Sequence, residues 1–237
     1  MVTEEGFVKM YVKGLDERIE GGIPGGSIVL CCGMPGTLKT TFCFNILFNH
    51  AKETGQKCLY VSLEQHRDSI VGQMKKLGLD PTLLGEKITI MDLAHLREML
   101  RESAGSDEQT DWLQTLVGQI KHAASEGNRV MALDSLDAVY ALAPMDNVRN
   151  KLFFFFEALR SMKMTSFLIT EMQPGSKAYG KFGVEGFLGD GIIHLDMEKV
   201  GKSVGRFISI VKLRGSNHPT DYFPLLVDKT GFKVVLR

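Results

Sequence analysis

The sequence has no excess of charge of either sign. Its 237 residues include 28 Lys and Arg and 28 Asp and Glu, so the formal net charge is zero. Nothing therefore draws the whole chain toward nucleic acid or an anionic membrane, and any such contact has to come from a local patch. Long apolar runs are also missing, since stretches such as residues 152–156 are far too short to cross a bilayer. The sequence predicts no membrane span.

The first thirteen residues lack the features of a secretory signal. They carry early acids, and no basic stretch followed by a long apolar segment is present. We therefore expect a cytoplasmic protein.

Cysteine is scarce, and polar linkers, internal repeats and low-complexity tracts are absent. The four cysteines fall in segments predicted to be core strands or a core helix, without metal-ligand spacing: Cys31, Cys32, Cys43 and Cys58. Buried thiols in a reducing compartment are favoured over a disulfide framework. The histidines show no metal-ligand spacing either. Without a linker to separate two cores, one domain over residues 1–237 is predicted.

What the sequence does contain is a glycine-rich turn between a strand-like run at 27–32 and a helix-like run at 41–50. The turn consists of Gly33, Met34, Pro35, Gly36, Thr37, Leu38, Lys39 and Thr40, with Thr41 next. Backbone N–H groups in such a turn form an anion site, to which the following helix dipole adds. Lys39 is placed to reach the β- and γ-phosphates, and Thr40 to bind Mg²⁺. The pattern predicts a phosphate loop, with an ordinary strand-turn-helix corner as the alternative.

Position 38 departs from the usual pattern, which has glycine directly before the lysine. Glycine is used where backbone must approach a ligand closely or adopt an unusual conformation. The Cβ of Leu38 is therefore expected either to crowd the phosphates or to strain the turn.

The order of elements predicts an α/β fold. Strands are predicted at 27–32, 57–62, 88–91, 129–134 and 166–170, and helices at 39–53, 67–77, 111–125 and 148–162, with a shorter candidate at 93–101. This alternation is typical of a mostly parallel, twisted sheet flanked by helices. Four later strands, at 191–196, 206–212, 225–227 and 232–236, are joined by short turns and predict a C-terminal antiparallel extension. Surface loops are predicted at 102–110 and 173–183.

Two carboxylates follow predicted strands. An apolar strand ends in Asp134, as expected where a carboxylate holds Mg²⁺ directly or through water. Glu64 follows the strand at 57–62 and is the candidate for polarising the attacking water. The alternatives are a turn or cap residue for Asp134, and an acid that complements the dipole of the helix at 67–77 for Glu64.

Two cations end a late strand. Lys212 and Arg214 alternate onto one face of it, where they either grip a phosphate or are simply solvated.

Taken together, the chain resembles the KaiC-like branch of the RecA superfamily of ATPases over nearly its whole length. Besides the phosphate loop, the resemblance rests on Gly14-Leu15-Asp16, Gly21-Gly22-Ile23-Pro24-Gly25-Gly26, Ser62-Leu63-Glu64-Gln65, Leu133-Asp134-Ser135-Leu136, Thr170-Glu171, Gly183-Val184-Glu185-Gly186-Phe187 with Asp190, and Lys212-Leu213-Arg214-Gly215-Ser216-Asn217-His218. The last segment is the most specific to that family.

The resemblance implies a RecA-like core with ATP between adjacent subunits of a ring homo-oligomer such as a hexamer. It implies that Lys212 and Arg214 act on the neighbour's phosphates, with Arg214 as an arginine finger. It also places Ser216, Asn217 and His218 near the nucleotide across the same interface.

The chain departs from the family pattern at Leu38 and at Gln65, where most members have a second glutamate. Glutamine can orient water but cannot take its proton, so slow hydrolysis is expected.

Three functions are therefore open. The first is a slow Mg²⁺-dependent ATPase whose ring switches a surface read by a protein partner that the sequence does not identify. The second is an ATP-binding scaffold with little turnover. The third is a recombinase-like DNA-binding protein that uses loops at 138–150 and 173–183, which offer Arg149, Lys177, Tyr179 and Lys181.

Overall fold

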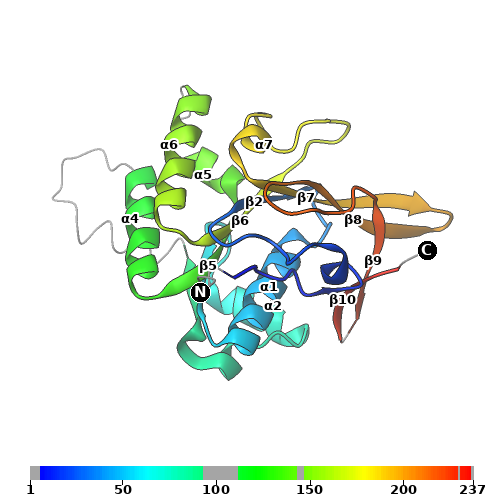
Figure 1. The fold of residues 1–237 in the computed structure, drawn as a ribbon, viewed down its shortest axis with the longest axis horizontal. Coiled ribbons are helices and arrows are strands. Elements are labelled where there is room, and N and C mark those ends of the chain that lie inside the picture. Colours follow the sequence, from blue (N-terminus) through cyan, green and yellow to red (C-terminus); the bar gives the residue numbers. More distant parts are fainter. Residues whose placement is uncertain (1–5, 93–111, 143–146, 229, 236–237) are drawn as a thin grey trace.

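The computed structural model describes residues 6–92, 112–142, 147–228 and 230–235, and these form a ten-stranded sheet with helices on both faces (Figure 1). The strands are β1 (Val12–Lys13), β2 (Ile28–Gly33), β3 (Lys57–Ser62), β4 (Ile88–Asp92), β5 (Asn128–Asp134), β6 (Thr165–Glu171), β7 (Gly191–Val200), β8 (Ser203–Leu213), β9 (Phe223–Asp228) and β10 (Gly231–Val234). The helices are α1 (Lys39–Thr54), α2 (Arg67–Lys76), α4 (Trp112–Ser125), α5 (Leu136–Leu142), α6 (Val148–Ser161) and α7 (Glu185–Leu188), with 3₁₀ turns η1 (Asp16–Arg18) and η2 (Pro81–Lys87).

The strand order confirms the predicted architecture. It runs β1-β10-β9-β8-β7-β2-β6-β5-β3-β4. Strands β7, β2, β6, β5, β3 and β4 pair in parallel, whereas β8, β9 and β10 follow β7 as an antiparallel extension. Because β2 lies between β6 and β7, the turn that follows β2 emerges inside the parallel region, with one parallel strand separating it from the antiparallel extension.

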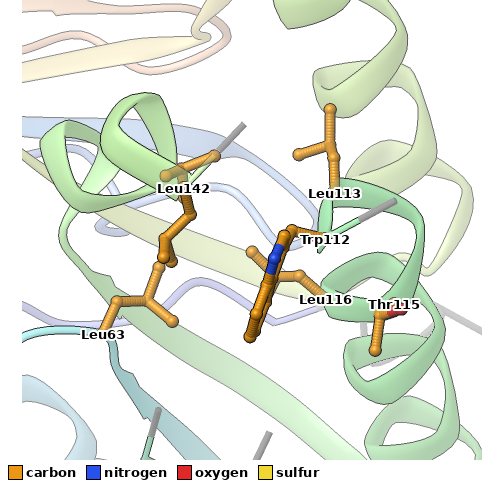
Figure 2. A pocket seen from close by; sticks show the side chains of 7 residues that line it. Leu63, Trp112, Leu113, Thr115, Leu116 and Leu142 are labelled. Carbon is orange, nitrogen blue, oxygen red and sulfur yellow. The ribbon is translucent and has the colours of Figure 1, made fainter. Parts of the chain in front are cut away.

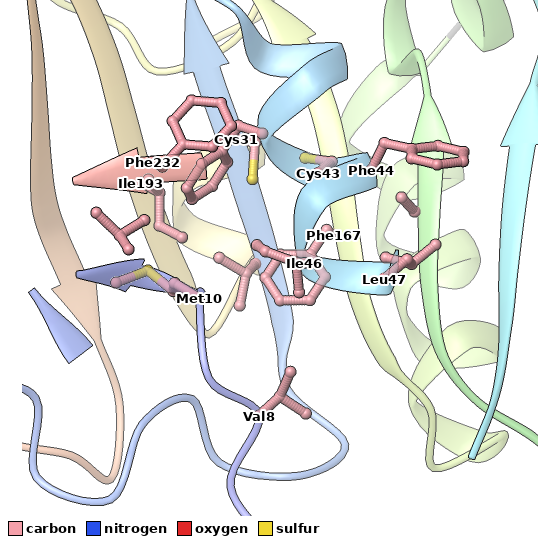
Figure 3. Packing of buried hydrophobic residues seen from close by; sticks show 14 of the residues in the cluster. Val8, Met10, Cys31, Cys43, Phe44, Ile46, Leu47, Phe167, Ile193 and Phe232 are labelled. Atoms are coloured by element: carbon pink, nitrogen blue, oxygen red, sulfur yellow. The ribbon is translucent and has the colours of Figure 1, made fainter. Parts of the chain in front are cut away.

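Side-chain alternation along β2 divides the core into two layers. Val29 and Cys31 face α1 and α2, where they join a cluster that includes Phe44, Ile46 and Phe167 (Figure 3). Ile28, Leu30 and Cys32 face α4, α5 and α6. A strand apolar on both faces is expected where helices cover both sides of a parallel sheet. β2 and its following turn are therefore held from both sides.

The prediction of a loop at 138–150 is wrong for its first residues, 138–142. Residues 136–142 form α5, because Val139 and Tyr140 are buried against the sheet and this packing stabilises a short helix. Residues 148–150 belong to α6. The predicted loop at 173–183 has no helix or strand, as expected. The candidate helix at 93–101 and the loop at 102–110 lie outside the described residues.

Strands β7 and β8 extend further than predicted. They form a long hairpin that projects beyond the helical layers (Figure 1), with Val200 and Val204 exposed near its tip. Within the described parts of the chain, no helix is long and apolar enough to span a membrane.

Candidate nucleotide-binding site

The turn after β2 has the backbone of an anion-binding loop. A Cβ at Gly33 would lie 2.1 Å from the carbonyl oxygen of Leu195, so only glycine fits there. Gly36 has φ 86°, in the left-handed region that favours glycine. The hydroxyl of Thr37 donates to the carbonyl of Met34 at 2.9 Å and closes the turn. Gly33 is therefore required by the space available, and Gly36 is favoured by the backbone conformation.

Leu38 takes the conformation that glycine would take. Its φ and ψ are 73° and 25°, which is left-handed, and it is the N-cap of α1. Its side chain is half-buried and packs against the core cluster on the α1 face. Of the two expected consequences of a leucine here, backbone strain is the one that the geometry bears out.

Lys39 is buried inside the loop. Its Nζ donates to the carbonyls of Gly33 at 2.9 Å and Met34 at 3.0 Å, and it lies 3.9 Å from Oε1 of Glu171 at the end of β6. The ammonium is thus held where a phosphate above the loop would meet it. Thr41, the third residue of α1, lines a surface groove between α1, residues 77–79 and the β9–β10 hairpin.

Asp134 and Thr40 meet at the carboxyl edge of the sheet. Oγ1 of Thr40 donates to Oδ2 of Asp134 at 2.8 Å, and the hydroxyl of Tyr60 donates to the same oxygen at 2.6 Å. Burial raises the pKa of Asp134 and the nearby Glu64 raises it further, while the hydrogen bonds from Tyr60 and Thr40 lower it. A hydroxyl and a carboxylate side by side are ligands that suit Mg²⁺.

Glu64 lies next to this pair through Ser135. Oγ of Ser135 donates to Oε1 of Glu64 at 2.6 Å, which ties the end of β5 to the end of β3. Glu64 is otherwise exposed to solvent. It follows β3 at the carboxyl edge of the sheet, the same edge at which the phosphate loop follows β2. The side chain of Gln65 is turned toward α2, where its Oε1 accepts from Nε2 of Gln73 at 3.1 Å.

Thr170 leaves an unsatisfied polar atom close to the loop. It pairs with Cys32 across β6 and β2, one residue before Gly33. Its hydroxyl is fully buried, and among the described residues no hydrogen-bond partner is found for it. Buried hydroxyls are normally satisfied by protein, ligand or ordered water, and leaving one unpaired costs about 1–3 kcal/mol. This atom fits a site completed by something other than the chain itself.

Tyr60 is a site residue that no sequence pattern singles out, and Glu171 entered only with the family resemblance, without a role. Strand alternation places Tyr60 on the same face as Cys58, but only the pairing of β3 with β5 brings it to Asp134. Glu171 ends β6 and meets Lys39 only because β6 pairs with β2.

The predicted cations lie at the opposite edge of the sheet. β8 runs antiparallel to β7, and Lys212 pairs with Ile192 at the amino end of β7. The backbone N–H of Arg214 donates to the carbonyl of Asp190 at 2.9 Å, and that of Asp190 to the carbonyl of Ile28 at 2.7 Å. Asp190 therefore connects Arg214 to the first residue of β2, whereas the phosphate loop follows the last.

The rest of that segment is at the same edge. Oγ of Ser216 donates to the carbonyl of Glu20 at 2.8 Å, and the carbonyl of Asn217 accepts from the backbone N–H of Glu20 at 3.1 Å. Nδ1 of His218 contacts the carbonyl of Pro219. The predicted site residues thus form two groups, which the structure does not bring together within one chain. The loop half comprises residues 33–40 with Glu64 and Asp134, and the cation half comprises Lys212, Arg214 and residues 216–218.

An apolar cavity beside Leu63 is a separate feature. It has a volume of about 10 Å³ and is lined by Leu63, Trp112, Leu113, Thr115, Leu116, Val139 and Leu142 (Figure 2). A cavity of this size admits no more than a water molecule, and its lining is apolar. It contributes nothing to a nucleotide site.

The parallel sheet and the loop after β2 define a nucleotide-binding α/β protein of the phosphate-loop class. The chain belongs to the KaiC family of ATPases, whose family model matches residues 8–237. The expected resemblance is thereby confirmed.

Individual relatives agree with this assignment. A UPF0273 protein of Methanocaldococcus jannaschii is 29% identical over 96% of this chain and 95% of its own. The circadian clock oscillator protein KaiC of Picosynechococcus is also 29% identical over 96% of this chain, but that match spans only 44% of the clock protein. A KaiC-like protein of Pyrococcus horikoshii has a similar crystal structure, with a TM-score of 0.83, 26% identity and coverage of 97% of this chain and 99% of that one.

Proposed function

We propose that the protein is a slow Mg²⁺-dependent ATPase that assembles into a ring, with each nucleotide held between the loop half of one subunit and the cation half of the next. In this proposal the bound nucleotide changes the conformation of a surface that a partner protein recognises.

The separation of the two halves is the observation that carries the proposal. β2 runs from Ile28, which Asp190 connects to Arg214, to Gly33, which opens the phosphate loop. Five residue steps of a parallel strand span about 16 Å, which is more than an arginine side chain reaches. If Lys212 and Arg214 contact phosphate at all, they contact a phosphate bound by another copy of the chain.

On the loop half, each residue has a defined task. The phosphates are bound by the ammonium of Lys39 and by backbone N–H groups of the loop, other than at Pro35. Thr40 and Asp134 would hold Mg²⁺, which would neutralise charge on the phosphate oxygens. Glu64, fixed by Ser135, orients the attacking water and accepts its proton. From the neighbour, Arg214 and Lys212 stabilise the charge that develops on the transferred phosphoryl group.

Exposed aromatic residues beside the cation half support assembly. Phe187 of α7 is 77% exposed, and its neighbours Gly186 and Gly189 supply the carbonyls that hold Lys212. On α6, Phe153 and Phe154 are exposed while Phe155 and Phe156 are buried. Large exposed apolar side chains gathered on one side of a protein are typical of interaction surfaces.

A scaffold that binds ATP without turnover is the second candidate, and Gln65 favours it. Its amide carries no charge and is engaged with Gln73, so it contributes no base to hydrolysis.

Phosphate release from Mg²⁺–ATP over a range of protein concentrations tests the proposal. We expect specific activity to rise with concentration and to vanish in Lys39→Ala, which removes the ammonium from the loop. Native specific activity in protein dilute enough to sediment as a monomer would exclude a site shared between subunits. ATP binding with background phosphate release, accompanied by a change in oligomer size, would favour the scaffold.

A further inference from the structure

Asp190 makes an unusually large set of contacts for a residue that no proposed catalytic step uses. Its Oδ1 accepts from Nη1 of Arg214 at 3.3 Å and from Nη2 of Arg160 at 3.2 Å. Its Oδ2 accepts from the backbone N–H of Ile28 at 3.1 Å. One carboxylate thus connects the predicted arginine finger, the end of α6 and the first residue of β2.

The backbone of Asp190 strengthens the same connection. Its N–H donates to the carbonyl of Ile28, and its carbonyl accepts from the N–H of Arg214. Both the guanidinium and the main chain of Arg214 are therefore tied to Asp190. Since β2 leads directly into the phosphate loop, Asp190 links the loop half and the cation half of one subunit.

The charges around Asp190 indicate what the carboxylate does. Arg160, Lys212 and Arg214 gather there, and Lys212 donates to the carbonyls of Gly186 and Gly189 at 3.0 and 2.6 Å. Burial lowers the pKa of Lys212 and Arg214 lowers it further, while Asp190 opposes the change. Without the carboxylate, three like charges would repel one another, and the long, 58% exposed side chain of Arg214 would lose its only ion pair among the described residues.

We propose that Asp190 is a positioning residue for the arginine finger, holding the guanidinium of Arg214 in the orientation in which it meets the neighbour's phosphates. This inference rests on the proposed function. Asp190 does not reach the phosphate loop of its own subunit, because it lies at the amino end of β2 and the loop follows the carboxyl end. Its effect comes through Arg214, by removing before assembly part of the freedom that this side chain otherwise loses on binding.

Asp190→Asn separates positioning from folding. The amide oxygen still accepts from the N–H of Ile28, while the charge that orients Arg214 is lost. Glu157→Gln is the matched control, because Glu157 pairs with Arg160 at 2.7 Å, while in the described part of the chain no hydrogen bond or ion pair joins Glu157 to Arg214. Each of the two substitutions is made in the native sequence and in the Arg214→Ala variant. Thermal unfolding of every variant is measured to show that it is folded.

Phosphate release and ATP affinity are measured at a concentration that favours assembly, and ATP affinity also in dilute protein. In the native background we expect Asp190→Asn to lower turnover about three- to tenfold, the factor that pre-ordering one long side chain supplies, with affinity in dilute protein unchanged. In the Arg214→Ala background it should have no further effect. Glu157→Gln should leave turnover at the native value in both backgrounds.

Each other outcome is decisive. Unchanged turnover in Asp190→Asn, or an equal loss in both backgrounds, would overturn the positioning role while leaving the shared site intact. If Arg214→Ala changes neither turnover nor affinity, the shared site itself fails, and the role of Asp190 fails with it. If turnover of the native protein is at background, the same set of variants is compared by ATP affinity in the assembled protein instead. Should Asp190→Asn not fold, Asp190→Glu, which keeps the charge but moves it by one methylene, is tested against the same expectations.

Discussion

Leu38 occupies a position where backbone conformation matters more than side-chain identity. A left-handed backbone costs a non-glycine residue about 1–2 kcal/mol, and this cost is accepted in the phosphate loop. The half-buried side chain recovers part of it by packing against the core cluster. The departure from the glycine pattern therefore changes the stability of the loop more than its shape.

A matched pair of substitutions tests this. Leu38→Ala loses the packing and keeps the strain, whereas Leu38→Gly loses the packing and relieves the strain. We expect Leu38→Gly to be more stable than Leu38→Ala by about 1 kcal/mol, measured by urea unfolding. If the alanine variant is the more stable of the two, the left-handed conformation is not the source of strain.

Gln65 is the departure that we expect to limit turnover. In Gln65→Glu a carboxylate follows Glu64 directly in the sequence, and phosphate release should rise by about two orders of magnitude, the lower end of the range for general-base catalysis. Gln73→Leu is the control, because it removes the hydrogen bond to Gln65 without adding charge. A rate in Gln65→Glu that stays at the native value would show that the missing carboxylate is not the cause of slow hydrolysis.

Helix α6 divides its four phenylalanines between two environments. Phe155 and Phe156 are buried under the sheet, and Phe153 and Phe154 are exposed. Successive residues on a helix are 100° apart, so a run of four must place some members outside the core. The element itself therefore presents an apolar surface next to its packed face.

Two substitutions in this run should have opposite effects on folding and assembly. Phe156→Ala is expected to lower the free energy of unfolding by about 3–5 kcal/mol, because it leaves a cavity in the core. Phe154→Ala should change it by less than about 0.5 kcal/mol, but should shift assembly to higher protein concentration. Thermal unfolding and sedimentation of both variants decide this. Native-like assembly of Phe154→Ala would place the subunit interface elsewhere.

For the whole molecule, the separation of the two halves makes a prediction about mixtures. Lys39→Ala has a defective loop half and an intact cation half, and Arg214→Ala has the reverse. In randomly mixed rings about a quarter of the interfaces combine the two intact halves. We expect the mixture to regain a corresponding share of native phosphate release, although each variant alone is nearly inactive. A mixture that stays as inactive as its components would argue that every site is completed within one chain.

Much of the fold was predictable because its signals are local. Apolar strands alternate with helical segments, and the late strands are joined by short turns, so both the parallel sheet and its antiparallel extension follow from the pattern. Helix α5 was not predicted, because seven residues carry too little periodicity and the packing of Val139 and Tyr140 decides their conformation. The phosphate loop was predictable because its eight residues are contiguous and form a recognisable pattern.

The sequence by itself determined the loop of residues 33–40, the strand that ends in Asp134 and the family to which the chain belongs, because contiguous residues and their order carry that information. Only the tertiary structure decided that Tyr60 joins Thr40 at Asp134, and that Arg214 lies against Asp190 at the amino end of β2 rather than beside Lys39. These relations depend on which strands pair and in which direction. Strand pairing is set by long-range packing across the whole sheet, which no single segment of the sequence encodes.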